Sequence, residues 1–352
     1  MSAKKTTEQK ENTEAFNAFA ERLDALRDKK SPALNFKTRA KAVASYDDQI
    51  RILKEKRHIS GVNGAYKDTL STITYYRLKG YLRNKKAGRL SFETACRFHE
   101  FDAQIRTLLF YVISKIELYF RSQFSYVYCS HYDDAYAYLN VAHYAGGGYA
   151  KFLGIVKRSI EQKQETPFVS HYLKNYGGLM PLWVVTELLE FGALEIFYQS
   201  WERTVRETLL HALYGDNNKD RYKIANDSNR FLSWLSSCVC LRNICAHSGR
   251  FYHRPFTKLP KFPEEFKLES ERKKQVDTNG KECKGDKDLL WGAVLALQFL
   301  YPNQDEWNEL IVPQIKALLE KFAPEIGNSR LRSAIGFPDD WEYWLRFWRT
   351  IP

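Results

Sequence analysis

The sequence predicts an all-α fold, and two observations support this class. Apolar residues recur with alternating steps of three and four along one stretch of more than twenty residues: Phe98, Phe101, Ile105, Leu108, Val112, Ile116 and Tyr119. Residues that favour helix ends stand where this stretch and its neighbours begin and stop. No segment of note alternates apolar and polar residues with the period of two that is typical of a half-buried strand.

The first ninety residues contain three predicted helices. The first carries four apolar residues on one face: Phe16, Phe19, Leu23 and Leu26. Ser45, with Asp48 three positions later, begins a second helix that runs through DQIRILKEKR. A third helix is expected over residues 64–83.

The middle of the chain begins with the longest predicted helix. Ser91 opens it, and its apolar pattern ends near Tyr128. Three glycines at 146–148 then interrupt the chain. Beyond them we expect helices at about 149–163, 166–175 and 181–201, the last with a proline in its first turn.

The last third contains four predicted helices and one charged loop. Asp227 or Ser228 caps a helix through FLSWLSSCVCLRNICAH, for which Gly249 is the expected stop. Residues 256–288 are rich in lysine and glutamate and poor in apolar residues, which is typical of a solvated loop. The closing helices are expected at about 287–301, 304–322 and 339–349.

Composition and charge indicate a globular protein with a polyanionic partner. The chain has 352 residues, 44% of them hydrophobic, and a formal net charge of +12, which suits a polyanionic partner. The N-terminus shows no secretory signal, and the apolar run at 289–301 is too short to span a bilayer. Six cysteines form no disulfide framework in a chain of this length. We therefore expect a cytoplasmic protein without a membrane segment.

A polar cluster follows the buried-looking run FLSWLSSCVC. Residues 241–254 read LRNICAHSGRFYHR. Arg242 and His247 are five positions apart, which on a helix means about 140° of rotation and about 7.5 Å of rise. They do not stack on one face, but both can border one groove at a helix end. The field of the helix C-terminus favours a protonated His247, which can give or take a proton at physiological pH.

One arginine and one histidine suffice for RNA cleavage, because the ribose 2′-OH already lies beside the scissile phosphate. His247 would transfer protons, and Arg242 would stabilise charge on the phosphate oxygens. Asn243 can hold the arginine or a phosphate oxygen, and Arg250 and Arg254 add positive charge. On spacing alone, a solvated helix end remains the alternative interpretation.

Five motifs in order resemble one protein family. RNICAH resembles the R-N-x-x-x-H signature of the HEPN ribonuclease superfamily, and the surrounding chain resembles its abortive-infection (Abi) D/F-type branch. The other motifs are ITYYRLKGY (73–81), FDAQIRTLLFYVISKIELYFRSQ (101–123), PLWVVTELLEFGALEIFY (181–198) and IGFPDDWEYW (335–344). The resemblance covers about residues 45–345.

The resemblance implies an HEPN-type helical bundle with additional N-terminal and C-terminal helices. It also implies metal-independent RNA cleavage, and a role in phage defence or as a toxin restrained by an RNA or protein antitoxin. Arg242 and His247 become the catalytic pair, with Asn243 as their polar companion. Family members often carry a second histidine directly after the first, whereas Ser248 stands here and His253 precedes Arg254. This departure leaves the roles of the residues after His247 open.

The same interpretation divides the chain into four parts. Residues 1–90 form an N-terminal helical region, and 91–255 form the HEPN-like core that ends in RNICAH. Residues 256–288 are the charged loop, and 289–352 are helices that pack on the core.

A second stretch, YYRLKGYLRNKKAGRL (75–90), interleaves tyrosines with basic residues. From Thr69 to Phe92 there are six basic residues and no acidic one. Basic groups follow a phosphate backbone and tyrosine rings stack on bases, so we predict RNA contacts here. The predicted contact residues are Tyr75, Tyr76, Arg77, Lys79 and Arg83. For the tyrosines, inward packing is an equal alternative.

The remaining signals are weaker. Glu117 and Arg121 are four positions apart on the longest helix; they form a surface ion pair or border the active site. Cys238 and Cys240 point apart on a helix and no second C-x-x-C exists, so we predict no metal and no cofactor.

The main functional prediction is an endoribonuclease, and the alternative is a non-catalytic RNA-binding regulator on the same fold. Cleavage needs one proton removed from the 2′-OH and another delivered to the 5′ oxygen. Two facing copies of the motif would supply two histidines. We therefore expect a homodimer.

Overall fold

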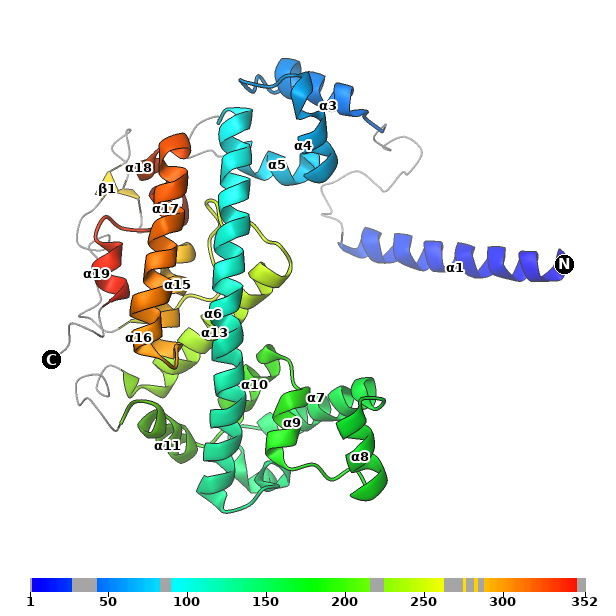
Figure 1. Cartoon of the computed structure of the whole chain (residues 1–352). Helices are drawn as coiled ribbons and strands as arrows, with labels where there is room; N and C mark the ends of the chain where they lie inside the picture. The colour runs from blue at the N-terminus through cyan, green and yellow to red at the C-terminus, as the bar shows by residue number, and fades with distance from the viewer. Residues whose placement is uncertain are drawn as a thin grey trace.

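Helix α6 (Phe92–Tyr132) is the long central helix of the molecule, and most of the helices that follow it in the chain lie along it (Figure 1). The structure is a computed structural model, and it describes residues 2–26, 43–82, 90–215, 225–262, 275–276, 282–283 and 288–346. Ser91 caps α6 by accepting a hydrogen bond from Thr94 N, as predicted. The helix continues four residues past its predicted end and stops at Asp133, whose φ is 51°. The apolar series from Phe98 to Ile116 is buried, which explains the length of the pattern.

The N-terminal helices form, but only some of them pack. Helix α1 (Ser2–Leu26) covers the first predicted helix, although Phe16, Phe19 and Leu26 on its apolar face are exposed. Helix α3 (Tyr46–Arg51) continues as a π-helical turn, η1 (Ile52–Lys56).

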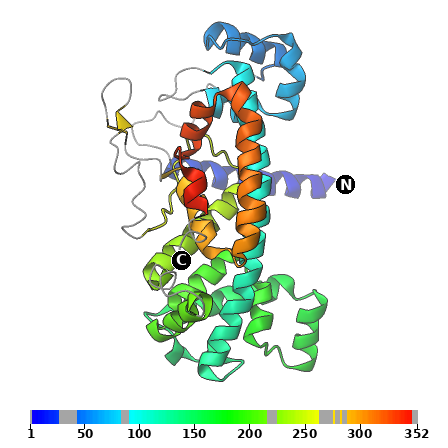
Figure 2. The same cartoon turned by 60° about the vertical axis from the view of Figure 1, so that its left-hand side comes forward.

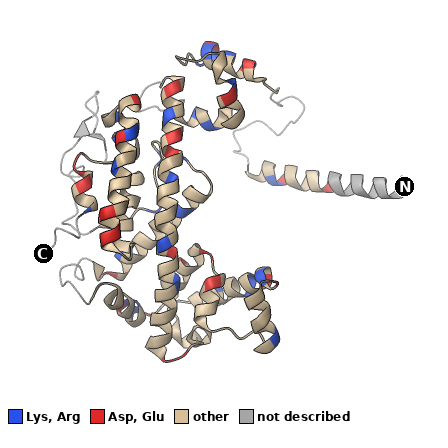
Figure 3. Ribbon diagram, in the orientation of Figure 1, with Lys and Arg blue, Asp and Glu red and all other residues tan. Residues whose placement is uncertain are grey.

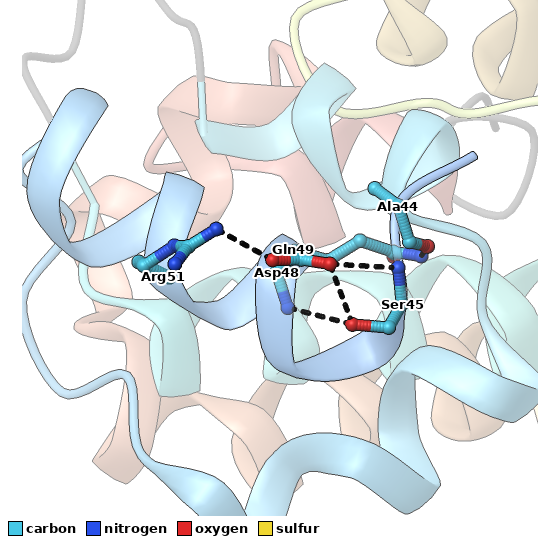
Figure 4. A network of polar contacts seen from close by, with 5 residues as sticks. All are labelled: Ala44, Ser45, Asp48, Gln49 and Arg51. Atoms are coloured by element: carbon cyan, nitrogen blue, oxygen red, sulfur yellow. Dashed lines mark hydrogen bonds and ion pairs between the residues drawn. The ribbon is translucent and has the colours of Figure 1, made fainter. Parts of the chain in front are cut away.

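Figure 4 shows the capping box that begins α3. Ser45 Oγ accepts from Asp48 N at 3.1 Å, and Asp48 Oδ2 accepts from Ser45 N at 3.3 Å. Two backbone donors that the helix leaves unpaired are thereby satisfied. Arg51 Nη2 adds a contact to Asp48 Oδ1 at 2.6 Å. The predicted start of this helix is confirmed.

The helix expected over 64–83 is broken into three pieces: η2 (Gly64–Tyr66), α4 (Lys67–Thr72) and α5 (Tyr75–Leu82). Ile73 is extended, with φ −119° and ψ 109°, and the carbonyl of Thr74 accepts from Arg77 N. β-branched residues tolerate this extended backbone well. The break turns α5 so that it packs against α6.

The lower part of the molecule in Figure 1 contains the next helices. Helices α7 (Gly148–Lys163) and α8 (Pro167–Asn175) agree with the prediction. The helix expected over 181–201 is two helices, α9 (Leu182–Leu188) and α10 (Phe191–Ser200), because Leu189 is extended with ψ 145°. Both pack against α6. Helix α11 (Arg203–Tyr214) was not predicted, although its buried residues recur at helical spacing: Val205, Leu209, Leu210 and Tyr214.

The C-terminal helices pack on α6 and on α13 (Ser228–Ala246). Helix α15 (Leu290–Leu300) is buried on all sides and lies against α13, where Trp234 stacks on Phe299 at 4.5 Å. The next segment consists of three consecutive helical pieces: α16 (Gln304–Glu306), η7 (Trp307–Ile311) and α17 (Val312–Ile326). Helix α17 runs beside α6 in both views (Figures 1 and 2). Helices α18 (Asn328–Ile335) and α19 (Trp341–Leu345) close the described chain.

The all-α class is confirmed. Short strands β1 (Gln275–Val276) and β2 (Glu282–Cys283) pair antiparallel within the charged loop. Residues 263–274, 277–281 and 284–287 of that loop lie outside the described residues. Within the described ranges, none of the helices combines the length and the apolar character needed to cross a bilayer.

Candidate active site

Helix α13 presents the RNICAH motif at its C-terminal end. Asp227, one of the two predicted caps, caps the other end by accepting from Asn229 N and Arg230 N at 2.9 and 3.0 Å. The helix ends in a Schellman motif: Ser248 N donates to Cys245 O at 3.1 Å and Gly249 N donates to Ile244 O at 2.7 Å. The left-handed position belongs to Ser248, with φ 52°, and not to Gly249, the predicted stop.

Gly249 serves a different purpose from the one expected. A Cβ at this position would lie 2.8 Å from Ile244 Cγ2 and 2.8 Å from Arg254 Nη1. Glycine therefore lets the chain pass close to the last turn of α13. Arg254 is half-buried beside this turn.

The predicted catalytic residues share this helix end. His247 is the C-cap of α13 and is exposed, and its N–H donates to Asn243 O at 3.0 Å. Asn243 is also exposed, and its Oδ1 accepts from Arg242 Nη1 at 3.4 Å. The Arg242 side chain is 31% exposed. All three can therefore meet solvent at one end of the helix.

Glu117 of α6 lies between two arginines. Its Oε1 is 2.5 Å from Arg121 Nη2, and its Oε2 is 3.9 Å from Arg242 Nε. Arg121 also donates to the carbonyl of Thr186 in α9. Arg242 Nε is buried and has no hydrogen-bond partner among the described residues. The predicted pair of Glu117 and Arg121 thus lies beside Arg242, and Arg242 is held only loosely.

A buried carboxylate holds the turn after His247. Asp102 of α6 is fully buried, and its Oδ2 accepts from Tyr81 OH at 2.8 Å, Phe251 N at 2.8 Å and Tyr252 N at 3.4 Å. Burial raises the pKa of Asp102 to about 6, while these three donors and Arg106 oppose that shift. Burial and the neighbouring Asp102 raise the pKa of Tyr81, so Tyr81 stays a donor.

Three arginines complete the support of this turn. Arg77 Nη1 of α5 donates to Ser248 O at 2.6 Å, and Arg106 Nη1 of α6 donates to Gly249 O at 2.9 Å. In the opposite direction, Arg250 of the turn donates to Gly80 O of α5, and its guanidinium lies 5.8 Å from the Tyr81 ring centre. The two stretches that the sequence singled out separately are therefore in contact.

The side chains of the predicted RNA-binding residues differ in their exposure to solvent. Tyr76 is 82% exposed, with Lys79 Nζ 5.9 Å from its ring centre, whereas Tyr75 is half-buried against the core. Arg77 is exposed although it contacts Ser248. Arg83 lies outside the described residues. Figure 3 shows Lys and Arg spread over many helices, so basic residues are not confined to α5.

Two of the three cysteines of α13, Cys238 and Cys245, are core residues, and Cys240 is partly buried. Burial raises the pKa of the Cys245 thiol to about 12 and that of Cys238 well above its ordinary value. Among the described residues, no group of three histidine, cysteine or acidic side chains gathers closely enough to hold a metal ion.

Asp102, Tyr81 and Arg106 were not predicted from the sequence as parts of the site. One signal was present: Asp102 follows Phe101 within the apolar series of α6, where a carboxylate is unfavourable unless it is hydrogen-bonded. Its partners could not be identified from spacing, because Phe251 is 149 positions away.

A family model described as "Abi-like protein" matches residues 68–253, more than half of the chain. The matched range includes α5, α6, α13 and the turn after His247. A search of curated proteins and a search of solved structures each found no match.

Proposed function

Because the chain belongs to the Abi-like protein family, we propose that it is a phage-defence endoribonuclease with an HEPN-type active site. The finding that supports this most directly is the end of α13, where Asn243 and His247 are exposed and the Arg242 side chain is 31% exposed. The proposed core is the range 91–255, whose last residues form this site.

In the proposed RNA cleavage, the substrate supplies the nucleophile, and the end of α13 supplies His247 and Arg242. The ribose 2′ oxygen attacks the adjacent phosphorus, the bond from phosphorus to the 5′ oxygen breaks, and a 2′,3′-cyclic phosphate and a 5′-hydroxyl result. His247 takes the proton from the 2′-OH or delivers one to the 5′ oxygen. Arg242 donates to the phosphate oxygens, whose charge grows in the transition state.

The loose contact of Arg242 supports this role. Its Nε lies beyond hydrogen-bond distance from Glu117, so the partly exposed side chain gives up little when its guanidinium turns toward a phosphate. Glu117 keeps the guanidinium near the helix end until RNA arrives. Arg121 neutralises Glu117 and limits its repulsion of the phosphate.

Helix α5 extends the RNA-binding surface that we propose. Arg77 reaches the carbonyl of Ser248, the residue after His247, so the positive charge of α5 borders the site. Tyr76 offers an exposed ring for stacking, and Lys79 lies over the same ring. Arg250 is partly exposed beside Gly80.

We further propose that the active unit is a homodimer, restrained in the cell by an RNA or protein antitoxin. One chain supplies a single exposed His247 at this helix end, whereas the reaction has two proton transfers. Two apolar side chains near the Glu117–Arg121 pair or its contact Thr186 along the chain are exposed: Leu118, which follows Glu117, is 64% exposed, and Trp183, three positions before Thr186, is 51% exposed. Such side chains suit an interface beside the site. Mixing wild-type protein with excess His247→Ala subunits should depress cleavage more than dilution does.

The deciding experiment is incubation of the purified protein with total RNA in EDTA, followed by mapping of the ends. We expect cyclic or 3′-phosphate ends and 5′-hydroxyl ends. His247→Ala, purified in the same way, should show no cleavage and thereby controls for contaminating nucleases. RNA binding without cleavage by the wild type would favour the non-catalytic regulator. Cleavage that requires added Mg²⁺ and leaves 5′-phosphates would contradict the proposed mechanism.

A further inference from the structure

The buried carboxylate of Asp102 anchors the turn at residues 248–252. Asp102 is fully buried within the apolar face of α6, where an unpaired carboxylate is strongly unfavourable. Three donors converge on its Oδ2, and two of them are backbone N–H groups of the turn. An apolar residue would suit packing there but could not accept these hydrogen bonds.

We propose that Asp102 is a positioning residue of the candidate site: it sets the turn after His247 and thereby the orientation of the His247 imidazole. This rests on the proposed function, because it assigns a role toward the same site. Asp102 does not touch the substrate in this proposal. It acts through the backbone of residues 251 and 252.

The path from Asp102 to His247 is short. Phe251 and Tyr252 are four and five positions beyond His247, and the intervening Ser248 and Gly249 carbonyls are held by Arg77 and Arg106. Ser248 also has a left-handed backbone, which the surrounding hydrogen bonds stabilise. The residue after His247 therefore has little freedom, and the C-cap geometry of His247 depends on it.

Helix α5 belongs to the same unit. Tyr81 OH donates to the Asp102 oxygen that also holds the turn, and Arg250 returns a hydrogen bond from the turn to Gly80. The contacts run in both directions between α5 and the turn. Displacement of α5 would therefore remove the contacts of Arg77 and Arg250, while those of Asp102 and Arg106 on α6 would remain.

A purely structural role for Asp102 would lower stability without a specific effect at His247. Two measurements separate the possibilities: the single-turnover cleavage rate with saturating RNA, and the NMR signal of the His247 imidazole, assigned by its loss in His247→Ala. The variants are Asp102→Asn and the milder Tyr81→Phe. Tyr138→Phe is the matched control, because Tyr138 is also buried and its OH donates to Met180 O at 2.8 Å, away from the turn.

We expect Asp102→Asn to lower the single-turnover rate by on the order of 10²-fold, since small misplacements of catalytic groups have effects of that size. The Kd for RNA should stay within about twofold, because Asp102 is distant from solvent. Tyr81→Phe should lower the rate less and shift the His247 signal, while Tyr138→Phe should change neither.

The proposal is overturned if the His247 signal and the cleavage rate of Tyr81→Phe match those of Tyr138→Phe. If Asp102→Asn does not fold, the two tyrosine variants decide the question. If the wild type cleaves no RNA, the proposed function fails, but the His247 signal still tests the positioning role. A rate loss matched by an equal loss of RNA binding, with an unmoved His247 signal, would also contradict it.

Discussion

Arg242 and the turn after His247 lie at the same end of α13, yet they are held in opposite ways. Arg242 has a 3.9 Å ion-pair contact to Glu117 and a long hydrogen bond to its neighbour Asn243. The turn at residues 248–252 is held by a fully buried carboxylate and by arginines from α5 and α6. One part of the motif is loosely restrained and the other is fixed.

The difference fits what each part has to do in the proposed reaction. An arginine that binds a phosphate must exchange its resting partner for the substrate, so a weak resting contact favours binding. A histidine that transfers a proton must meet one oxygen at hydrogen-bond distance, so a fixed backbone favours turnover.

Removal of Arg242 should have the largest effect on chemistry and almost none on folding. Arg242→Ala should lower the cleavage rate by about 10²–10³-fold, as does the removal of a donor to a developing oxyanion elsewhere. Its melting temperature should change little, because Arg242 makes only weak polar interactions in the folded protein. Arg242→Lys should recover only part of the rate, since lysine lacks the forked donor. A wild-type rate in Arg242→Ala would contradict the assignment.

Asp102→Asn should change the pH dependence of stability. The folded-state pKa of Asp102, about 6, lies above its ordinary value, so the folded state binds this proton more tightly than the unfolded state. The stabilising contribution is present at low pH and is lost as pH rises through 6. Relative to the variant, the wild type should lose on the order of 2 kcal/mol between pH 4.5 and 7. Urea unfolding of both proteins at the two pH values measures this.

The opposite sign, with the wild type gaining stability over Asp102→Asn as pH rises, would mean that the hydrogen bonds outweigh burial in the pKa of Asp102.

Glu117→Gln should separate binding from turnover. Without the carboxylate, no negative charge offsets those of Arg242 and Arg121, so RNA should bind severalfold more tightly at low salt. Arg242 is then less well oriented, so the single-turnover rate should fall severalfold. The matched control is Glu207→Gln, which also removes the acidic partner of an arginine four positions away, Arg203, but on α11. Equal effects of the two variants would show that only net charge matters.

Charge reversal on α5 should affect binding more than chemistry. Lys79→Glu should weaken RNA binding and reduce the salt dependence of log Kd by about one unit of slope for each phosphate that the variant no longer binds. Arg77→Glu should do the same and also slow turnover, because Arg77 holds Ser248 O. Lys157→Glu on α7 is the control for overall charge. An equal slope change in all three variants would place RNA away from α5.

Ser248→Gly should have the smallest effect. The left-handed backbone of Ser248, with φ 52°, costs serine about 1–2 kcal/mol of stability. Glycine avoids this cost, but part of the gain is cancelled because glycine loses more conformational freedom on folding. The free energy of unfolding should therefore rise by less than about 1 kcal/mol. Asp133→Gly at the end of α6 has nearly the same φ and should gain similarly. Only Ser248→Gly should alter the cleavage rate, and identical rates in both variants would weaken the link between the turn and His247.

Local sequence determined the helices whose signals lie within a few residues. The capping box at Ser45 and Asp48, the start of α6 at Ser91 and the cap at Asp227 were predictable because each donor and acceptor is close along the chain. The position of RNICAH at a helix end was predictable for the same reason. The catalytic and RNA-binding roles assigned to these residues remain predictions.

The tertiary structure decided where helices break and what the motif contacts. Leu189 is extended so that α9 and α10 can each pack on α6, and no residue nearby forces this break. Asp102 meets Phe251 and Tyr81 only because α5, α6 and the turn converge. Helical periodicity describes one face of one helix. The partner of a buried carboxylate depends on how three elements pack, and the burial of the surrounding apolar surface determines that packing.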